Sequence, residues 1–380
     1  MADPLLVVLF LRGGIDGLNL IAPTGDADYI AARPASLRVL RKGDTAGFAL
    51  ANPVADADFR FHPQARGLSE LYDAGELAVI HAAGLTDGTR SHFDAEDRME
   101  RAARSGAAGG WLGRWLKQAA PEGILPALAV GAAAPESVAG AADAVAVAEE
   151  LEQLIPAAGY DVSPLLRQRL RAGFGRHPVL GAPVERLISL SEALESRLWN
   201  RETGELGAYV PDVDYPEDSP LSQSLMMVAQ AAKLGLGLRV ATVDYGGWDT
   251  HYDQAGEFAT LTEGLSSALM AFWRDLGAIR ARTTVVIMSE FGRRLRANRS
   301  GGTDHGYGNA MMVLGGEVSG GRMLGRWPGL SNDALDSGTD LAITTDYRHV
   351  LAEIMARHMG VEDTAAIFPD FSPAFPGLFA

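Results

Sequence analysis

Short apolar runs recur along the chain and are separated by stretches with helical spacing. The runs are continuous, which is typical of strands buried on both faces of a sheet. The clearest are Leu5–Leu11, Leu77–Ala82, Ala127–Val130, Leu238–Val243 and Thr284–Met288. Amphipathic helices, with apolar residues every three or four positions, are predicted at Pro183–Leu198, Leu221–Leu234 and Gly256–Leu276. This alternation predicts an α/β fold, a mostly parallel sheet sandwiched between helices.

Residues 105–160 have a less regular pattern. They are rich in Ala and Gly with interspersed prolines, and we predict a strand plus loops there rather than a linker between domains. A chain of 380 residues is long enough for one large domain. We therefore predict a single domain over residues 1–380, with insertions to its core within 105–235.

Composition narrows the classes of function. The chain has no cysteine, so any metal must be held by oxygen and imidazole ligands. Its net charge of −15 argues against nucleic-acid binding. No segment reaches the roughly 18 apolar residues that a membrane-spanning helix requires. Leu5–Leu11 is short and has no positive region ahead of it, which indicates a buried strand rather than a signal peptide.

Polar residues that follow the predicted strands are the candidates for chemistry, because ligands bind at the carboxyl ends of strands in open α/β sheets. Asp16 follows the first strand in a glycine turn, although an ordinary turn would have the same pattern. Ser91 and His92 follow the second strand. Ser91 occupies an N-cap position with Asp94 three residues later, which resembles a capping box. Alternatively, its hydroxyl lies at a helix N-terminus that favours a bound anion.

Two acid–histidine pairs lie in separate glycine-rich loops. Asp249 and His251 follow the fourth strand, and Asp304 and His305 precede the apolar run 310–314. Oxygen and imidazole this close together suit a divalent cation. Glu290 follows the fifth strand, where a carboxylate must be paired or ligated. Together these residues favour a metal site over flexible surface loops.

The cations nearest this cluster in the sequence are Arg12, Arg90 and Arg293. They could hold an oxyanion or neutralise the carboxylates. The remaining histidines (His62, His81, His177, His349 and His358) are interpreted as ordinary surface or interior residues.

The ordered motifs resemble the DUF1501 family of uncharacterised bacterial proteins within the alkaline phosphatase-like superfamily, which includes sulfatases and phosphatases. They lie within residues 9–316 and read LRGGIDGLN, RSHFDAED, GGWDTH, SEFGRR and GGTDHGYGNAMMVLGG. The resemblance implies a parallel sheet between helices, with metal ions at the carboxyl ends of the strands.

The resemblance also implies roles for individual residues. Ser91 matches the nucleophile, with His92 and Arg293 as charge stabilisers. Phe291 stands where the superfamily usually has a ligating histidine, which favours one divalent ion (zinc, manganese, calcium or magnesium) over two. The implied metal ligands are Asp16, Asp249, His251, Glu290 and His305, with Asp304 as a replacement ligand.

The function that follows is a metal-dependent hydrolase of phosphate or sulfate esters, acting on a small-molecule or glycan substrate. Phe291 favours an alternative, a metal-binding scaffold without hydrolysis that is secreted and works with a partner on polysaccharide. A further alternative is a metal-free hydrolase or isomerase that uses Ser91 and His92 directly. Family members are often exported, so we expect a periplasmic or extracellular location, with the cytoplasm as the alternative.

Overall fold

A nine-stranded sheet forms the centre of the computed structural model, which describes residues 3–103, 107–156, 163–200, 202–217 and 219–379. Neighbouring strands pair in parallel except where β14 is involved. The strands in hydrogen-bonded order are β15 (Arg322–Leu324), β5 (Leu77–Gly84), β14 (Asn309–Gly315), β11 (Thr283–Met288), β1 (Leu5–Leu11), β10 (Val240–Tyr245), β6 (Ala127–Val130) and β7 (Val145–Ala148), with β16 (Thr345–Asp346) beside β5. The predicted mostly parallel sheet is confirmed.

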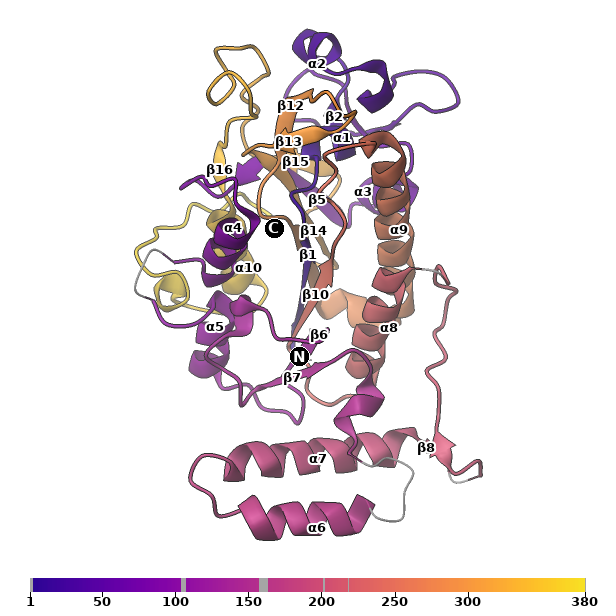
Figure 1. Cartoon of the computed structure of the whole chain (residues 1–380), viewed down its shortest axis with the longest axis vertical. Coiled ribbons are helices and arrows are strands. Elements are labelled where there is room, and N and C mark those ends of the chain that lie inside the picture. The colour runs from indigo at the N-terminus through magenta and orange to yellow at the C-terminus, as the bar shows by residue number, and fades with distance from the viewer. Residues whose placement is uncertain (1–2, 104–106, 157–162, 201, 218, 380) are drawn as a thin grey trace.

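Two layers of helices cover the sheet, as Figure 1 shows. The central strand β1 is buried along its whole length and sends alternate side chains to opposite faces. Leu5, Val7 and Leu9 join one core cluster, whereas Leu6 and Val8 join the other. The first cluster includes residues of α3 (Arg66–Asp73), α8 (Pro220–Lys233) and α9 (Gln254–Asp275), and the second includes residues of α4 (His92–Arg101), α5 (Trp111–Ala119) and α10 (Tyr347–Arg357).

The predicted strands and helices are confirmed with small shifts of their ends, but residues 105–160 needed correction. This region holds helix α5 as well as β6 and β7, so the prediction of a strand plus loops was wrong in part. Trp111, Leu112, Trp115 and Leu116 are buried along one side of α5. This helical spacing was present in the sequence, but it did not lead to a predicted helix, because the helix is short and the residues around it are rich in glycine and alanine. Residues 105–106 and 157–160 lie outside the described residues.

The shorter elements connect the sheet to its loops. They are α1 (Gly17–Leu20), β2 (Ile21–Pro23), α2 (Ala27–Ala32), β3 (Phe48–Ala49), β4 (Phe59–Phe61), β8 (Trp199–Asn200), β9 (Glu205–Leu206), β12 (Arg293–Ala297) and β13 (Thr303–His305). Among the described residues, no helix is both long and apolar enough to cross a membrane.

Helices α6 (Ser163–Phe174) and α7 (Gly181–Leu198) form a hairpin beyond the end of the sheet where the N-terminus of the chain lies (Figure 1). Helix α7 buries Ile188, Leu190 and Leu194, whereas most of α6 is exposed. The hairpin therefore lies at the opposite end of the molecule from the carboxyl ends of the parallel strands.

The reversed direction of β14 decides which loops meet at that carboxyl edge. Because β14 pairs antiparallel with both β11 and β5, its first residue, Asn309, lies at the edge where β1, β10 and β11 end. The loop ahead of β14, which carries His305, is thereby brought to the same edge as the loops that follow the parallel strands.

Candidate metal centre

Three imidazole rings and one carboxylate converge at the carboxyl edge of the sheet. The Nε2 atom of His305 lies 3.1 Å from Nε2 of His92 and 2.9 Å from Nε2 of His251. Oδ1 of Asp249 lies 3.0 Å from Nε2 of His251, 3.1 Å from that of His305 and 3.4 Å from that of His92. His92, Asp249 and His305 form a group that could hold a metal ion.

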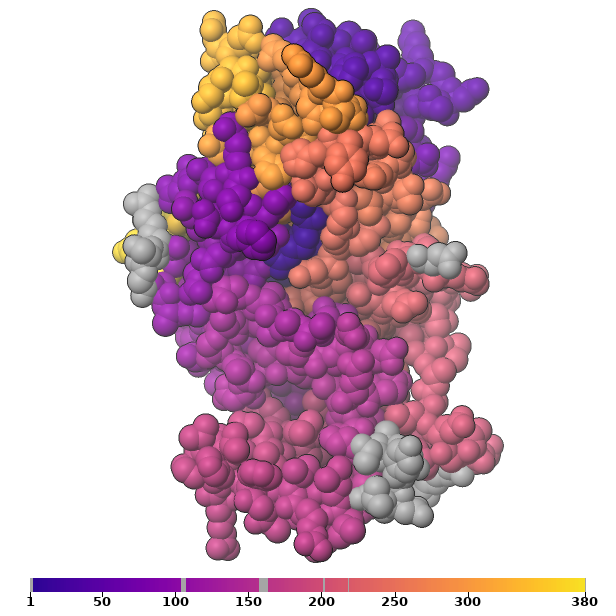
Figure 2. All heavy atoms as spheres, in the orientation of Figure 1, coloured from indigo at the N-terminus to yellow at the C-terminus, as the bar shows by residue number. Residues whose placement is uncertain are grey.

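These residues come from three separate segments of the chain. His92 is the first residue of α4, Asp249 and His251 lie in the loop that follows β10, and His305 ends β13. Figure 2 shows the surface hollowed in this region, with violet atoms of the α4 segment and salmon atoms near residue 250 on either side of indigo atoms from the N-terminal part of the chain. The Asp249 side chain is 47% exposed, so a solute can reach the centre.

Each imidazole has an acceptor at its outer nitrogen. Nδ1 of His92 lies 2.7 Å from Oε1 of Glu290, and Nδ1 of His305 lies 2.8 Å from the carbonyl oxygen of Arg90. Nδ1 of His251 lies 3.5 Å from Oδ1 of Asp304. A proton on each Nδ1 satisfies these acceptors and leaves a lone pair on each Nε2.

Those lone pairs then face one another. Neutral imidazoles with Nε2 lone pairs about 3 Å apart repel, and the carboxylate of Asp249 adds a further acceptor. A cation at the shared position would remove the conflict by accepting these lone pairs, and the ligand atoms of His92, Asp249 and His305 lie close enough together to hold one. The donor set therefore fits a metal ion.

The surroundings favour the protonation states that metal binding requires at His305, Asp249 and Glu290, but not at His92. Burial lowers the pKa of His305, which favours its neutral form. Burial opposes ionisation of Asp249, but favourable interactions led by the hydrogen bond from Arg293 outweigh it and lower the pKa of the carboxyl. For buried Glu290, hydrogen bonds led by that of His92 likewise outweigh burial and lower the pKa. The bond to Glu290 in turn raises the pKa of His92.

Glu290 contacts the outer side of this cluster. Its side chain is fully buried, and it accepts hydrogen bonds from the backbone N–H of Gly13 at 2.8 Å and the hydroxyl of Ser289 at 2.9 Å, besides contacting His92. The structure thus places this predicted ligand behind His92. Glu290 also belongs to a second group that could hold a metal, with His92 and Glu96. Sequence analysis missed Glu96, although it lies one helical turn after His92.

Arg293 crosslinks the loops that carry the centre. Its buried guanidinium donates to the carbonyl oxygens of Gly14 at 2.6 Å and Thr303 at 2.8 Å, and to Oδ1 of Asp249 at 2.6 Å. It also donates to the carbonyl oxygens of Gly13 and Trp248. With its donors committed to the protein, Arg293 is suited to positioning Asp249 rather than to binding a substrate.

The side chain of Asp16 contacts other residues than the three histidines. It is fully buried and forms an ion pair with Arg33, whose Nη2 lies 2.9 Å from Oδ1, and it accepts from Nε2 of Gln254 at 2.7 Å. Its charge is neutralised by protein groups, so its metal-ligand role stays a prediction. Arg33 and Gln254 carry no sequence motif that would have identified them as its partners.

Removing Arg33 is expected to destabilise the fold strongly. Arg33→Met leaves the Asp16 carboxylate buried without its cation, and breaking a buried pair costs about 3–5 kcal/mol. Urea unfolding measures this free energy. The matched control is Arg41→Met, because Arg41 is 57% exposed in its pair with Asp58 and such a pair contributes about 0–1 kcal/mol.

The double variant Asp16→Asn with Arg33→Met removes both charges and should recover part of the loss. If Arg33→Met lowered the free energy of unfolding no more than the Arg41 control, the buried pair would not stabilise the protein as inferred.

In the sequence, Ser91 lies between Arg90, which contacts the centre, and His92, which belongs to it. Arg90 accepts a hydrogen bond from His305, and His92 contributes Nε2. Ser91 occupies the N-cap position of α4, is exposed, and its side chain makes no capping hydrogen bond. The capping box considered from the sequence is therefore not formed, and the hydroxyl is free of that bond.

Phe291 forms an apolar wall of the centre. Its ring centroid lies 4.8 Å from those of both His92 and His305, and the side chain is buried. A carbon ring, which offers no ligand atom, thus lies beside two of the imidazoles.

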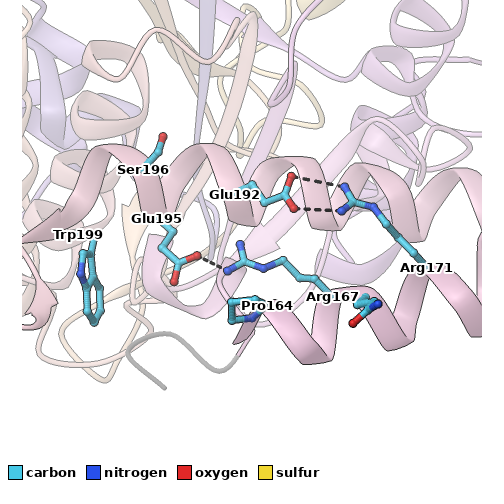
Figure 3. Close-up of a pocket in the computed structure, with 8 residues that line it drawn as sticks. Pro164, Arg167, Arg171, Glu192, Glu195, Ser196 and Trp199 are labelled. Atoms are coloured by element: carbon cyan, nitrogen blue, oxygen red, sulfur yellow. Dashed lines mark hydrogen bonds and ion pairs between the residues drawn. The ribbon is translucent and has the colours of Figure 1, made fainter. Parts of the chain in front are cut away.

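A cavity of about 630 Å³ lies elsewhere, on the α6–α7 hairpin (Figure 3). Its charged side chains pair with one another, since Arg167 contacts Glu195 and Arg171 lies 3.2 Å from Glu192. Because the charges of these pairs are neutralised and lie far from the histidines, we do not assign the chemistry to this cavity.

A family model described as "Protein of unknown function (DUF1501)" matches residues 81–368. No curated protein matches the chain. Similar solved structures include the C-terminal periplasmic domain of EcEptC from Escherichia coli in complex with Zn, at 8% identity and a TM-score of 0.39, covering 83% of this chain and 74% of that one.

Two further structures are similar at the same level. The PsFucS1 sulfatase from Pseudoalteromonas sp. has 12% identity and a TM-score of 0.33, covering 84% of this chain and 64% of that one. The alkaline phosphatase from the Antarctic bacterium TAB5 has 10% identity and a TM-score of 0.33, covering 82% and 92%. These similarities are too distant to bring an activity to this chain.

Proposed function

The chain belongs to the DUF1501 family of proteins of unknown function, and we propose that it is a metal-dependent hydrolase of phosphate or sulfate esters. The observation that carries the proposal is the convergence of three Nε2 atoms and Oδ1 of Asp249, with an acceptor behind each imidazole. Such an arrangement is difficult to satisfy without a cation.

The proposed ligands differ in part from those expected from the sequence. His92 replaces Glu290 in direct contact with the ion, and Asp16 is left out because Arg33 and Gln254 hold it. The proposed ligands are His92, Asp249, His251 and His305. Glu290 and Asp304 orient the rings of His92 and His251 from behind, as outer carboxylates do in metal sites. Three imidazoles and one carboxylate favour zinc over magnesium or calcium, which prefer all-oxygen ligands. One ion is proposed, because the ring of Phe291 lies against His92 and His305 and offers no ligand atom for a second.

Ser91 is proposed as the nucleophile. Its Oγ loses its proton to solvent and bonds to phosphorus or sulfur, while the bond to the substrate's alcohol oxygen breaks and that oxygen takes up a proton. Water then hydrolyses the serine ester, which releases phosphate or sulfate and restores the serine hydroxyl. A bound ion would stabilise the ester's negative oxygens and lower the pKa of a nearby hydroxyl. The first-turn N–H groups of α4, which Ser91 does not cap, offer further donors to those oxygens.

Two exposed aromatic residues support an organic ester as the substrate. Phe93 is 86% exposed and follows His92, and Tyr252 is 68% exposed and follows His251. Large aromatic rings beside a polar centre offer apolar contact area. We propose that they contact the alcohol part of a small-molecule or glycan ester.

Metal depletion and reconstitution test the proposed function. Protein stripped by a chelator should hydrolyse neither 4-nitrophenyl phosphate nor 4-nitrophenyl sulfate, and added zinc should restore hydrolysis of at least one of them. Manganese, calcium and magnesium are the comparison ions, and release of 4-nitrophenol is the measurement.

The other outcomes each favour a different function. Tight metal binding without turnover of either ester class would contradict hydrolysis and favour the scaffold, for which Phe291 is the supporting feature. Activity that survives exhaustive chelation would contradict the metal-dependent mechanism and favour a metal-free enzyme.

A further inference from the structure

Exposed large apolar side chains are concentrated on the α6–α7 hairpin. Residues 163–198 make up about a tenth of the chain but carry five of the twelve exposed large hydrophobic residues found among the described residues. These five are Leu165, Phe174, Val179, Leu180 and Leu187. Single exposed apolar residues are ordinary on protein surfaces, whereas a concentration of them marks an interaction site.

The turn between the two helices carries three of these residues. Residues 171–180 are all exposed, and Phe174, Val179 and Leu180 are exposed by 40%, 71% and 42%. His177 fixes the turn, because its Nδ1 accepts hydrogen bonds from the backbone N–H groups of Val179 at 3.2 Å and Leu180 at 3.1 Å. These hydrogen bonds fix the conformation of the turn, in which the apolar side chains are exposed to solvent.

The hairpin is basic although the whole chain is acidic. Residues 163–184 contain four arginines and no Asp or Glu, whereas the chain has a net charge of −15. Arg167 and Arg171 pair with glutamates of α7. Arg169 and Arg176 are exposed, and neither side chain has a carboxylate partner among the described residues. Unneutralised positive charge therefore flanks the apolar turn.

The position of the hairpin separates this charge from the acidic body. The two helices lie at one end of the molecule, beyond the sheet, as Figure 1 shows. Charges on exposed surfaces are largely screened beyond a Debye length of about 8 Å at physiological ionic strength. An anionic surface that contacts the hairpin would therefore be attracted by its arginines without strong repulsion by the body.

We propose that the α6–α7 turn is an interfacial anchor that binds the surface of an anionic lipid bilayer. Phe174, Val179 and Leu180 enter the boundary between headgroups and acyl chains, and Arg169 and Arg176 contact the lipid phosphates. A protein partner would be expected to cover a broad face, whereas the apolar residues here are gathered on a narrow basic turn. The inference is independent of the proposed hydrolase activity.

Vesicle flotation with the full chain tests this anchor. The wild type should float with vesicles of equal parts phosphatidylglycerol and phosphatidylcholine, less so as salt is raised, and should not float with phosphatidylcholine alone. Phe174→Ser with Val179→Ser, and separately Arg169→Gln with Arg176→Gln, should each lower the bound fraction about tenfold or more.

The matched control changes the same residue types at the other end of the molecule. Ile30→Ser with Arg299→Gln alters an exposed apolar residue and an exposed arginine there, and flotation should match that of the wild type. Circular dichroism and thermal melting confirm that all variants fold.

Three outcomes would overturn the proposal. The first is a wild type that fails to float, and the second is hairpin variants that float as well as the control. The third is self-association in sedimentation that the hairpin variants abolish without any vesicle binding, which would make a second copy of the chain the occupant of this surface.

Discussion

His305→Ala is expected to remove the metal from the protein. The Nε2 atom of His305 lies within about 3 Å of Nε2 of both His92 and His251 and of Oδ1 of Asp249, so it is the one imidazole in contact with all the other proposed ligands. Its loss leaves three ligands on two separate segments. Because loss of an outer-sphere partner alone costs about 10–100-fold in metal affinity, loss of this ligand should cost more than 100-fold.

Elemental analysis and competition with a chromophoric chelator measure this loss. The wild type should hold one equivalent, and His305→Ala and Asp249→Ala should hold none at micromolar free metal. Glu290→Gln, which changes an outer partner, should retain metal with about 10–100-fold weaker affinity. The control is His349→Ala, because His349 lies outside the centre on α10. One equivalent retained by His305→Ala would contradict the assigned centre.

Ser91→Ala is expected to lower the hydrolysis rate about 10³-fold or more without loss of metal. Removal of a nucleophile that acts with its partners as a unit has effects of this size or larger. Stability should hardly change, because the Ser91 side chain makes no capping hydrogen bond. Rate measurements on a confirmed ester substrate, with metal analysis of the same sample, give both values.

Ser219→Ala is the informative comparison for that variant. The Ser219 side chain caps α8 by accepting from the backbone N–H of Ser222, so its replacement should cost about 1 kcal/mol of stability and leave the rate unchanged. A Ser91→Ala protein with full activity would show that Ser91 is not the nucleophile.

The sheet and the location of the centre could be predicted from the sequence for physical reasons. Strands buried on both faces are continuous apolar runs, and the runs at β1, β6 and β11 were recognisable without any partner information. Since parallel strands end at one edge, residues following β10 and β11 could be expected to meet. His305 precedes an antiparallel strand, and it entered the set because it forms a second acid–histidine pair with Asp304, which the family resemblance then supported.

The division of roles within the centre could not be predicted. Either His92 or Glu290 could face the shared position of the ligand atoms. Which one does so depends on the direction in which the local backbone points each side chain, and residue spacing in the sequence does not specify that direction. Asp16 was expected beside the metal because it follows β1, but Arg33 lies in the segment after α2, whose path over the sheet no local pattern specifies.

The central place of β1 has a consequence for how the chain is made. Leu6 pairs with Val240 and Leu5 with Thr283, so β1 leaves the ribosome more than two hundred residues ahead of both of its partners. At about 5–20 residues per second, synthesis of the residues from Leu11 to Met288 takes about 14–55 s. The apolar segment LLVVLFL has neither edge paired until β10 is made, and one edge stays unpaired until β11 is made. Nascent chains of this protein should therefore depend on chaperones that hold this segment apart until the last central strand emerges.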